Sequence, residues 1–158
     1  MRIVGVDLDS KKIAIAIFDD SKFTSYFFYH SKIKNTQERI FDLYDEFGVI
    51  IKGISPNKVY FEDSLYIQNF KSSKVLSEVL GNCKLVCRLA QIPFGVVSNK
   101  TWKKIVIGNG NATKEDIKNF VLAKYNDKFD DNEPQDVFDS IGIGLYGIYK
   151  EELEKING

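Results

Sequence analysis

Three strand-like segments open the chain, at residues 2–8, 12–18 and 23–30, and the first two are rich in β-branched residues. Short polar turns that begin at Asp9 and Asp19 separate them. Hydrophobic runs interrupted by such turns are typical of consecutive antiparallel strands. The pattern therefore predicts three antiparallel strands in succession.

The middle of the chain alternates between helical and strand patterns. Ile40, Leu43, Phe47 and Ile50 recur at helical spacing and predict a helix over residues 36–51, which Gly53 and Pro56 end. A strand, a helix and another strand are then expected, at residues 58–62, 72–92 and 93–97. Such alternation favours parallel pairing, with helices packed on the sheet.

The last third of the chain predicts two more helices. Thr113 can cap a helix that runs to Lys124, because Asp116 stands three residues further on, as in a capping box. Pro134 suits the first turn of a final helix that extends to about residue 153. Glycines inside that helix cost stability, so we expect compensation by close packing on the sheet at Gly142, Gly144 and Gly147.

Length and composition indicate one α/β domain over residues 1–158, with a mixed sheet of five strands, three antiparallel and then two parallel. No run of about 20 apolar residues predicts a membrane span. The early Asp7 does not suit a signal peptide, so we expect a cytoplasmic protein. One histidine and two cysteines, Cys83 and Cys87, exclude a disulfide framework and a Cys/His zinc site.

The net charge of zero hides a strong asymmetry along the chain. Residues 71–118 hold nine basic and three acidic side chains, whereas residues 119–158 hold four basic and nine acidic ones. A local field attracts a polyanion even when the whole chain is neutral. The basic middle segment can therefore bind nucleic acid, or its lysines can simply solvate helix faces.

Four acidic residues interrupt apolar runs, where an unpaired charge is costly. They are Asp7, Glu62, Asp136 and Asp139. If the strands that carry the first two are neighbours, all four can converge on one point. Oxygen donors without His or Cys suit Mg²⁺ or Mn²⁺, and a pair of such ions about 4 Å apart can hydrolyse a phosphodiester.

Each of these acids also has a plain structural explanation. Asp7 can be a turn residue, Glu62 can be a surface charge at a strand end, and Asp136 can interact with the dipole of the last helix. Two further acids near the group, Asp9 and Asp63, face solvent or support the site from outside.

Four segments resemble the RuvC family of Holliday junction resolvases, in order and across nearly the whole chain: IVGVDLDS, KVYFED, SNKTWKKIVIGNGNATKEDI and PQDVFDSIGIG. The resemblance implies a ribonuclease H-like fold and a homodimer. It also implies paired nicking of four-way DNA junctions with two Mg²⁺ ions per active site, which Mn²⁺ can replace. A bacterium or its phage would encode such a protein.

The resemblance assigns roles to particular residues. It implies that the catalytic and metal-binding residues are Asp7, Glu62, Asp136 and Asp139, and that two lysines near the scissile phosphate are Lys103 and Lys114. Other candidate DNA contacts are Tyr66, Phe70, Lys71, Lys74 and Lys104. The chain departs from the family at Leu8 and Asp9, where Pro-Gly is usual, and at Leu65, where an aromatic is usual.

These departures leave cleavage of forks and other branched DNA open beside strict junction resolution. A non-catalytic binder of branched DNA with the same fold is the alternative, although the complete acidic set argues against it. An actin-like phosphotransferase also opens with a motif such as GVDLDS, but it needs two such domains, and 158 residues supply one.

Overall fold

A single mixed sheet forms the centre of the computed structural model, which describes residues 1–63, 69–130 and 132–158. Its strands are β1 Arg2–Leu8, β2 Lys12–Asp19, β3 Lys22–His30, β4 Lys58–Glu62 and β5 Phe94–Val97. The order is β3-β2-β1-β4-β5, with antiparallel pairing among β1, β2 and β3 and parallel pairing of β4 with β1 and β5. The predicted sheet is confirmed.

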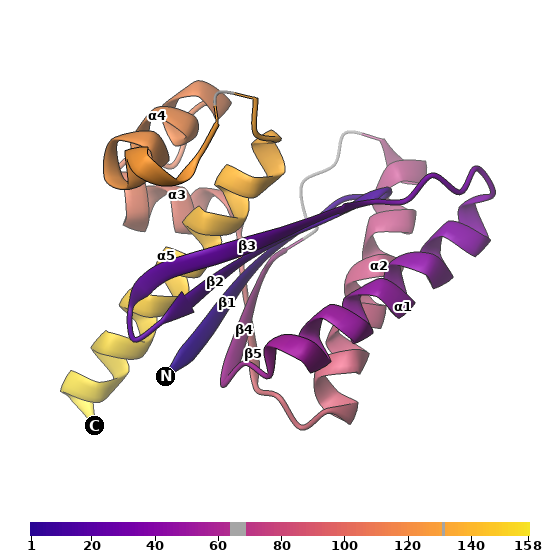
Figure 1. Ribbon diagram of the computed structural model, residues 1–158, viewed down its shortest axis with the longest axis horizontal. Coiled ribbons are helices and arrows are strands. Elements are labelled where there is room, and N and C mark those ends of the chain that lie inside the picture. Colours follow the sequence, from indigo (N-terminus) through magenta and orange to yellow (C-terminus); the bar gives the residue numbers. More distant parts are fainter. Residues whose placement is uncertain (64–68, 131) are drawn as a thin grey trace.

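Helices cover both faces of the sheet (Figure 1). They are α1 Thr36–Ile54, α2 Phe70–Leu89, α3 Asn99–Ile107, α4 Lys114–Tyr125 and α5 Gln135–Asn157, with a short 3₁₀ turn, η1, at Asn126–Lys128. The first two lie on one face, and α5 lies on the other with α3 and α4 beside its first half. Within the described ranges, no helix combines the length and the apolar character that a membrane crossing requires.

The strand pleat divides the core into two clusters. On β1, Val4 and Val6 point to the face that α1 and α2 cover, whereas Ile3 packs in the cluster under α5. Because side chains alternate along a strand, Gly5 and Asp7 share the α5 face with Ile3. The strand pattern thus turns Asp7 toward α5.

The glycines of α5 let the helix approach the sheet closely. A methyl group on Gly144 would lie 2.3 Å from the ring of Phe18, and one on Gly147 would lie 2.4 Å from the ring of Tyr60. Below them, a methyl group on Gly5 of β1 would lie 2.2 Å from the backbone oxygen of Ser140. The predicted close packing on the sheet is confirmed at Gly144 and Gly147, whereas a methyl group on Gly142 would meet Trp102 of α3 instead. The contact at Gly5 fixes α5 directly over β1.

Helix bounds differ from the sequence predictions in several places. The helix expected over residues 72–92 spans Phe70–Leu89. The first helix continues through Gly53 to Ile54, where Ser55 adopts a left-handed conformation with φ of 50°. The final helix runs to Asn157 rather than to residue 153. Residues 99–107 form α3, which was not predicted, because only Trp102 and Val106 of this short helix are buried and no periodicity stands out.

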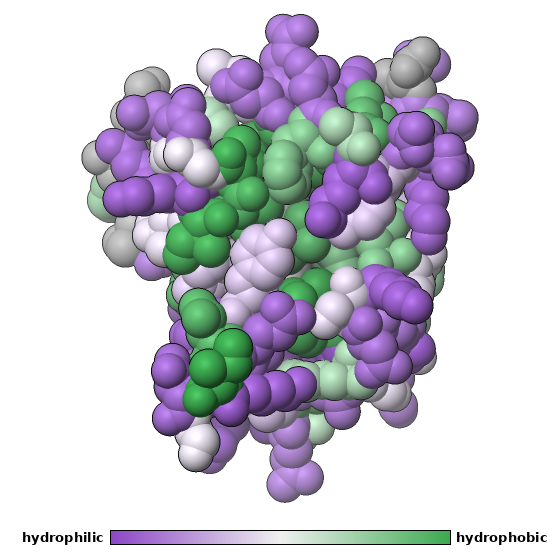
Figure 2. All heavy atoms as spheres, turned by 90° about the vertical axis from the view of Figure 1, so that its left-hand side faces the viewer, coloured by the Kyte–Doolittle hydropathy of each residue, from purple (hydrophilic) through white to green (hydrophobic). Residues whose placement is uncertain are grey.

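Polar and apolar side chains separate on the face that α3, α4 and α5 cover. Figure 2 shows hydrophilic side chains crowding the upper end of this face, where α4 and the start of α5 lie in Figure 1. Hydrophobic side chains gather across its middle. The exposed large apolar residues of these helices are Ile105, Leu153 and Ile156.

Candidate active site

Two neighbouring strands bring Asp7 and Glu62 to the same edge of the sheet. Val6 of β1 pairs with Phe61 of β4 in a parallel register, so the next residue of each strand lies at the same level. Val6 and Phe61 both belong to the cluster under α1 and α2. Alternation therefore turns Asp7 and Glu62 to the opposite face, toward α5.

The first turns of α5 supply the other two carboxylates. Asp136 and Asp139 are three residues apart, on one side of the helix. Gln135 precedes them, and its side-chain amide donates a hydrogen bond of 3.1 Å to Asp139 Oδ1. Since α5 crosses β1 in close contact at Gly5, its N-terminal end lies above Asp7.

The four acids form one electrostatic group. Burial raises the pKa of Asp7 well above its usual range, and Asp139, Glu62 and Asp136 raise it further, in that order. Burial also raises the pKa of Asp139 to about 6, against the lowering effects of Gln135 and Lys103. The negative charges are thus close enough to oppose the ionisation of Asp7 and Asp139, as expected of carboxylates that share a site.

Glu62 is fixed by two donors that the sequence reasoning missed. The indole N–H of Trp102 donates to Glu62 Oε2 at 2.5 Å, and the side-chain amide of Asn99 donates to the same oxygen at 3.1 Å. Trp102 is fully buried, so its N–H needs an internal acceptor. The signal available in the sequence was this lone tryptophan, whose buried polar group had to find a partner.

The donor chemistry of the group fits a hard divalent cation, because carboxylate oxygens are the ligands that Mg²⁺ and Mn²⁺ prefer. In the part of the chain that the structure describes, however, no three acidic, His or Cys side chains are already arranged to hold a metal ion. The charges of Asp139, Glu62 and Asp136 all act on Asp7, so the four carboxylates lie near one another at this edge of the sheet.

Lys103 stands beside the acidic group. Its side chain is half-buried, its Nζ lies 5.8 Å from the ring centroid of Trp102, and its charge lowers the pKa of Asp139. Lys114 and Lys104 are exposed, Lys114 at the first position of α4 and Lys104 near the end of α3. The predicted capping box of α4 between Thr113 and Asp116 is confirmed.

The remaining candidate DNA contacts lie at the start of α2. Phe70 is the first residue of this helix and is 86% exposed, and Lys71 and Lys74 are exposed on the following turn. Tyr66 lies outside the described residues. An aromatic side chain so open to solvent can contribute little to folding, which makes it available for contacts with another molecule.

A second lysine, Lys12, also reaches the acidic group and was not singled out in the sequence. Its Nζ lies 3.7 Å from Asp136 Oδ2 and 3.7 Å from Asp9 Oδ2. Asp9, expected near the edge of the site, accepts backbone N–H groups from Lys11 and Lys12 and so builds the turn between β1 and β2. Lys12 was missed because it looks like an ordinary polar residue at the start of a strand.

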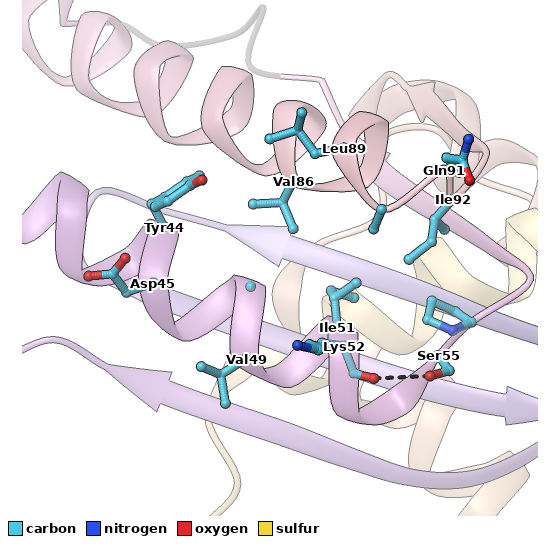
Figure 3. Close-up of a pocket in the computed structure, with 13 residues that line it drawn as sticks. Tyr44, Asp45, Val49, Ile51, Lys52, Ser55, Val86, Leu89, Gln91 and Ile92 are labelled. Carbon is cyan, nitrogen blue, oxygen red and sulfur yellow. Dashed lines mark hydrogen bonds between the residues drawn. The ribbon is translucent and has the colours of Figure 1, made fainter.

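An apolar groove of about 800 Å³ lies on the other face of the molecule (Figure 3). Its lining includes Tyr44 and Val49 of α1 and Val86 and Leu89 of α2, which are labelled in Figure 3. Because α1 and α2 cover the sheet face away from α5, the groove is separate from the acidic group.

Comparison with known proteins identifies the family. A sequence profile described as Crossover junction endodeoxyribonuclease RuvC matches residues 3–146. The protein of that name from Aliarcobacter butzleri (strain RM4018) is 30% identical over 152 residues, which cover 92% of this chain and 96% of the relative. The corresponding protein of Sulfurovum sp. (strain NBC37-1) is 26% identical over 159 residues and covers 98% and 99%.

The fold agrees with this match. The structure of Thermus thermophilus RuvC in complex with Holliday junction substrate superimposes with a TM-score of 0.83 at 15% sequence identity, covering 98% of this chain and 96% of the other. The expected ribonuclease H-like architecture is thereby confirmed. With the profile spanning most of its length, the chain belongs to the RuvC family of crossover junction endodeoxyribonucleases.

Proposed function

We propose that the protein is a divalent-metal-dependent endonuclease that resolves Holliday junctions by paired nicks. The observation that carries this proposal is the group of four carboxylates from β1, β4 and α5 at one end of the sheet, where the other three raise the pKa of Asp7. Relatives named for crossover junction cleavage match nearly the whole chain. A fold retained only for binding DNA would not need to keep this costly group of charges.

The metal-binding residues in this proposal are Asp7, Glu62, Asp136 and Asp139. Family membership implies dependence on a divalent metal, and we infer two Mg²⁺ ions per site, which Mn²⁺ can replace. Bound ions of this kind would activate a water molecule and stabilise the leaving 3′-oxygen. The four carboxylates would be the catalytic residues.

The surrounding side chains would orient the acids and meet the DNA. Trp102 and Asn99 hold one oxygen of Glu62, and Gln135 holds one oxygen of Asp139, which leaves the other oxygens for ligation. Lys103, beside Asp139, would contact the scissile phosphate as a point charge. Lys114 and Lys104 would contact neighbouring phosphates and make binding dependent on salt.

The exposed start of α2 would contact the DNA away from the acids. Phe70 would stack on an unpaired base, with Lys71 and Lys74 on the adjacent phosphates. We assign the same kind of contact to Tyr66. These residues would favour branched DNA over a continuous duplex, because only branched DNA offers bases that are easily unstacked.

Paired nicks need two active sites, so we propose that the chain acts as a homodimer of single domains. Its substrate would be chromosomal or phage DNA, so the protein would act in the bacterial cytoplasm.

The test is to incubate the purified protein with a labelled four-way junction, a replication fork and a linear duplex, with and without Mg²⁺, and to map the nicks. Symmetric paired nicks confined to the junction and dependent on Mg²⁺ are expected. Similar cutting of the fork would indicate a looser nuclease for branched DNA. Binding to the junction without any metal-dependent nick would contradict the proposal and favour a non-catalytic binder.

A further inference from the structure

Lys12 is a positive charge among the carboxylates. Its ammonium group lies 3.7 Å from Asp136 and 3.7 Å from Asp9, and its side chain is 34% exposed, against 19% for Asp136. It therefore stands at the mouth of the acidic group, in contact with one of the four proposed metal ligands.

The position of Lys12 follows from the strand pattern. Ile13, Ile15 and Ile17 of β2 pack under α1 and α2, so Lys12, Ala14 and Ala16 face α5. Ala14 pairs with Asp7 of β1. Lys12 is thus one step along the same face from the residue directly opposite Asp7.

The turn that carries Lys12 is held firmly. Asp9 Oδ1 accepts the backbone N–H groups of Lys11 and Lys12 at 2.6 and 2.8 Å. The buried guanidinium of Arg39, on α1, donates to the Ser10 carbonyl at 2.8 Å and also to the carbonyls of Ile33 and Lys34. These bonds fix the backbone from which the Lys12 side chain extends toward Asp136 and Asp9.

We propose that Lys12 is a positioning residue that serves as an internal counter-cation: it holds Asp136 in the metal-free protein, and a divalent ion must displace it to recruit that carboxylate. This inference rests on the proposed function, because it concerns the same four acids.

Asp9 remains an ionic partner for the Lys12 ammonium group after a metal ion displaces it from Asp136. Asp9 Oδ2 is as close to Lys12 Nζ as Asp136 Oδ2 is, so the lysine keeps one ionic partner when Asp136 turns to the metal. Asp9 Oδ1 remains bound to the turn throughout. The exchange therefore depends on Asp9 and Lys12 together.

Because Lys12 competes for Asp136, the protein needs a higher concentration of metal ion to fill the site. Removing a partly exposed ion pair changes an equilibrium constant by up to about fivefold. Removing the positive charge of Lys12, a few ångströms from the bound divalent ion, also removes the repulsion between the two cations. Lys12→Gln should therefore tighten binding of the first metal ion by roughly tenfold. Lys12→Arg, which keeps the charge and the reach, should stay near wild type.

The experiment measures Mn²⁺ binding without DNA, from the electron paramagnetic resonance signal of free Mn²⁺, in wild type, K12Q, K12R and K11Q. K11Q is the matched control, because Lys11 is an exposed lysine in the same turn. The proposal predicts tighter binding only in K12Q. It also predicts that the K12Q effect becomes smaller in a D136N background, because the ion pair with Asp136 is already gone and only the charge of Lys12 near the ion remains to be removed.

Equal Mn²⁺ affinities in wild type and K12Q, weaker binding in K12Q, or equal gains in K12Q and K11Q would each overturn the role of Lys12. Those results would leave the metal site itself intact. If wild type bound no Mn²⁺, or if D7N bound it as well as wild type does, the proposed metal site would fail, and the role of Lys12 with it.

Discussion

Gly5 is the position at which a single added methyl group should separate α5 from the sheet. A Cβ atom there would lie 2.2 Å from the Ser140 oxygen, 2.3 Å from the Gly144 nitrogen and 2.6 Å from the Gly144 Cα. All three atoms belong to the backbone of α5, so no side chain can rotate away. Gly5→Ala therefore forces the helix to rise by about 1 Å to reach ordinary contact distances.

The cost has a stability part and a catalytic part. Overpacking of this kind destabilises a core by about 1–3 kcal/mol, and a backbone contact belongs at the upper end of that range. The same shift moves Asp136 and Asp139 relative to Asp7. A displacement of about 1 Å can reduce a catalytic rate by roughly 100-fold, so junction nicking should fall by about that factor in protein that is still folded.

Urea unfolding and single-turnover nicking of a four-way junction measure the two effects. Gly48→Ala is the matched control, because a Cβ atom on Gly48, inside α1, meets nothing within 4 Å. It should leave nicking unchanged and raise the free energy of unfolding by up to about 1 kcal/mol. If G5A unfolded at the wild-type urea concentration and nicked at the wild-type rate, the close seating of α5 on β1 would be refuted.

Three further changes test other contacts. Trp102→Phe removes the donor to Glu62 and should lower the free energy of unfolding, measured in urea, by about 1–3 kcal/mol. Because burial raises the pKa of Asp139 to about 6, its stabilising contribution in the metal-free protein is present near pH 4 and is lost as the pH rises through 6. Unfolding of wild type and D139N over this range should thus show a smaller loss of stability in D139N. Phe70→Ala should weaken junction binding in a fluorescence titration by about 1–3 kcal/mol per stacked base and leave stability unchanged.

Each of these expectations has a result that contradicts it. Wild-type stability of W102F would mean that Glu62 is held without the indole. Parallel pH profiles of the free energy of unfolding in wild type and D139N would contradict the raised pKa of Asp139. Unchanged junction affinity of F70A would place the base contacts elsewhere on the protein.

The strands and the acidic group could be predicted from sequence because local signals were strong. Alternation fixes which face of β1 carries Asp7, and the KVYFE run fixes Glu62 at the end of a neighbouring strand. The three glycines of α5 predicted close packing. The rings of Phe18, Tyr60 and Trp102 occupy the space that side chains at these positions would have taken.

The contacts that tune the site could not be predicted in the same way, because they join residues far apart in the chain. Trp102 reaches Glu62 across 40 positions from a short helix without clear periodicity. Lys12 meets Asp136 only because α5 crosses β1 and β2. Such pairings depend on the tertiary crossing of two elements, which no pattern within either element reveals.

The most direct test of the central claim compares wild type with Asp7→Asn on a labelled four-way junction, with nicking measured in Mg²⁺ and binding measured in Ca²⁺. Asp7 lies at the centre of the acidic group, and asparagine preserves its size while removing its charge. D7N should bind the junction with wild-type affinity and should produce no nicks above background. Nicking by D7N at the wild-type rate would contradict the assignment of these carboxylates as the catalytic centre.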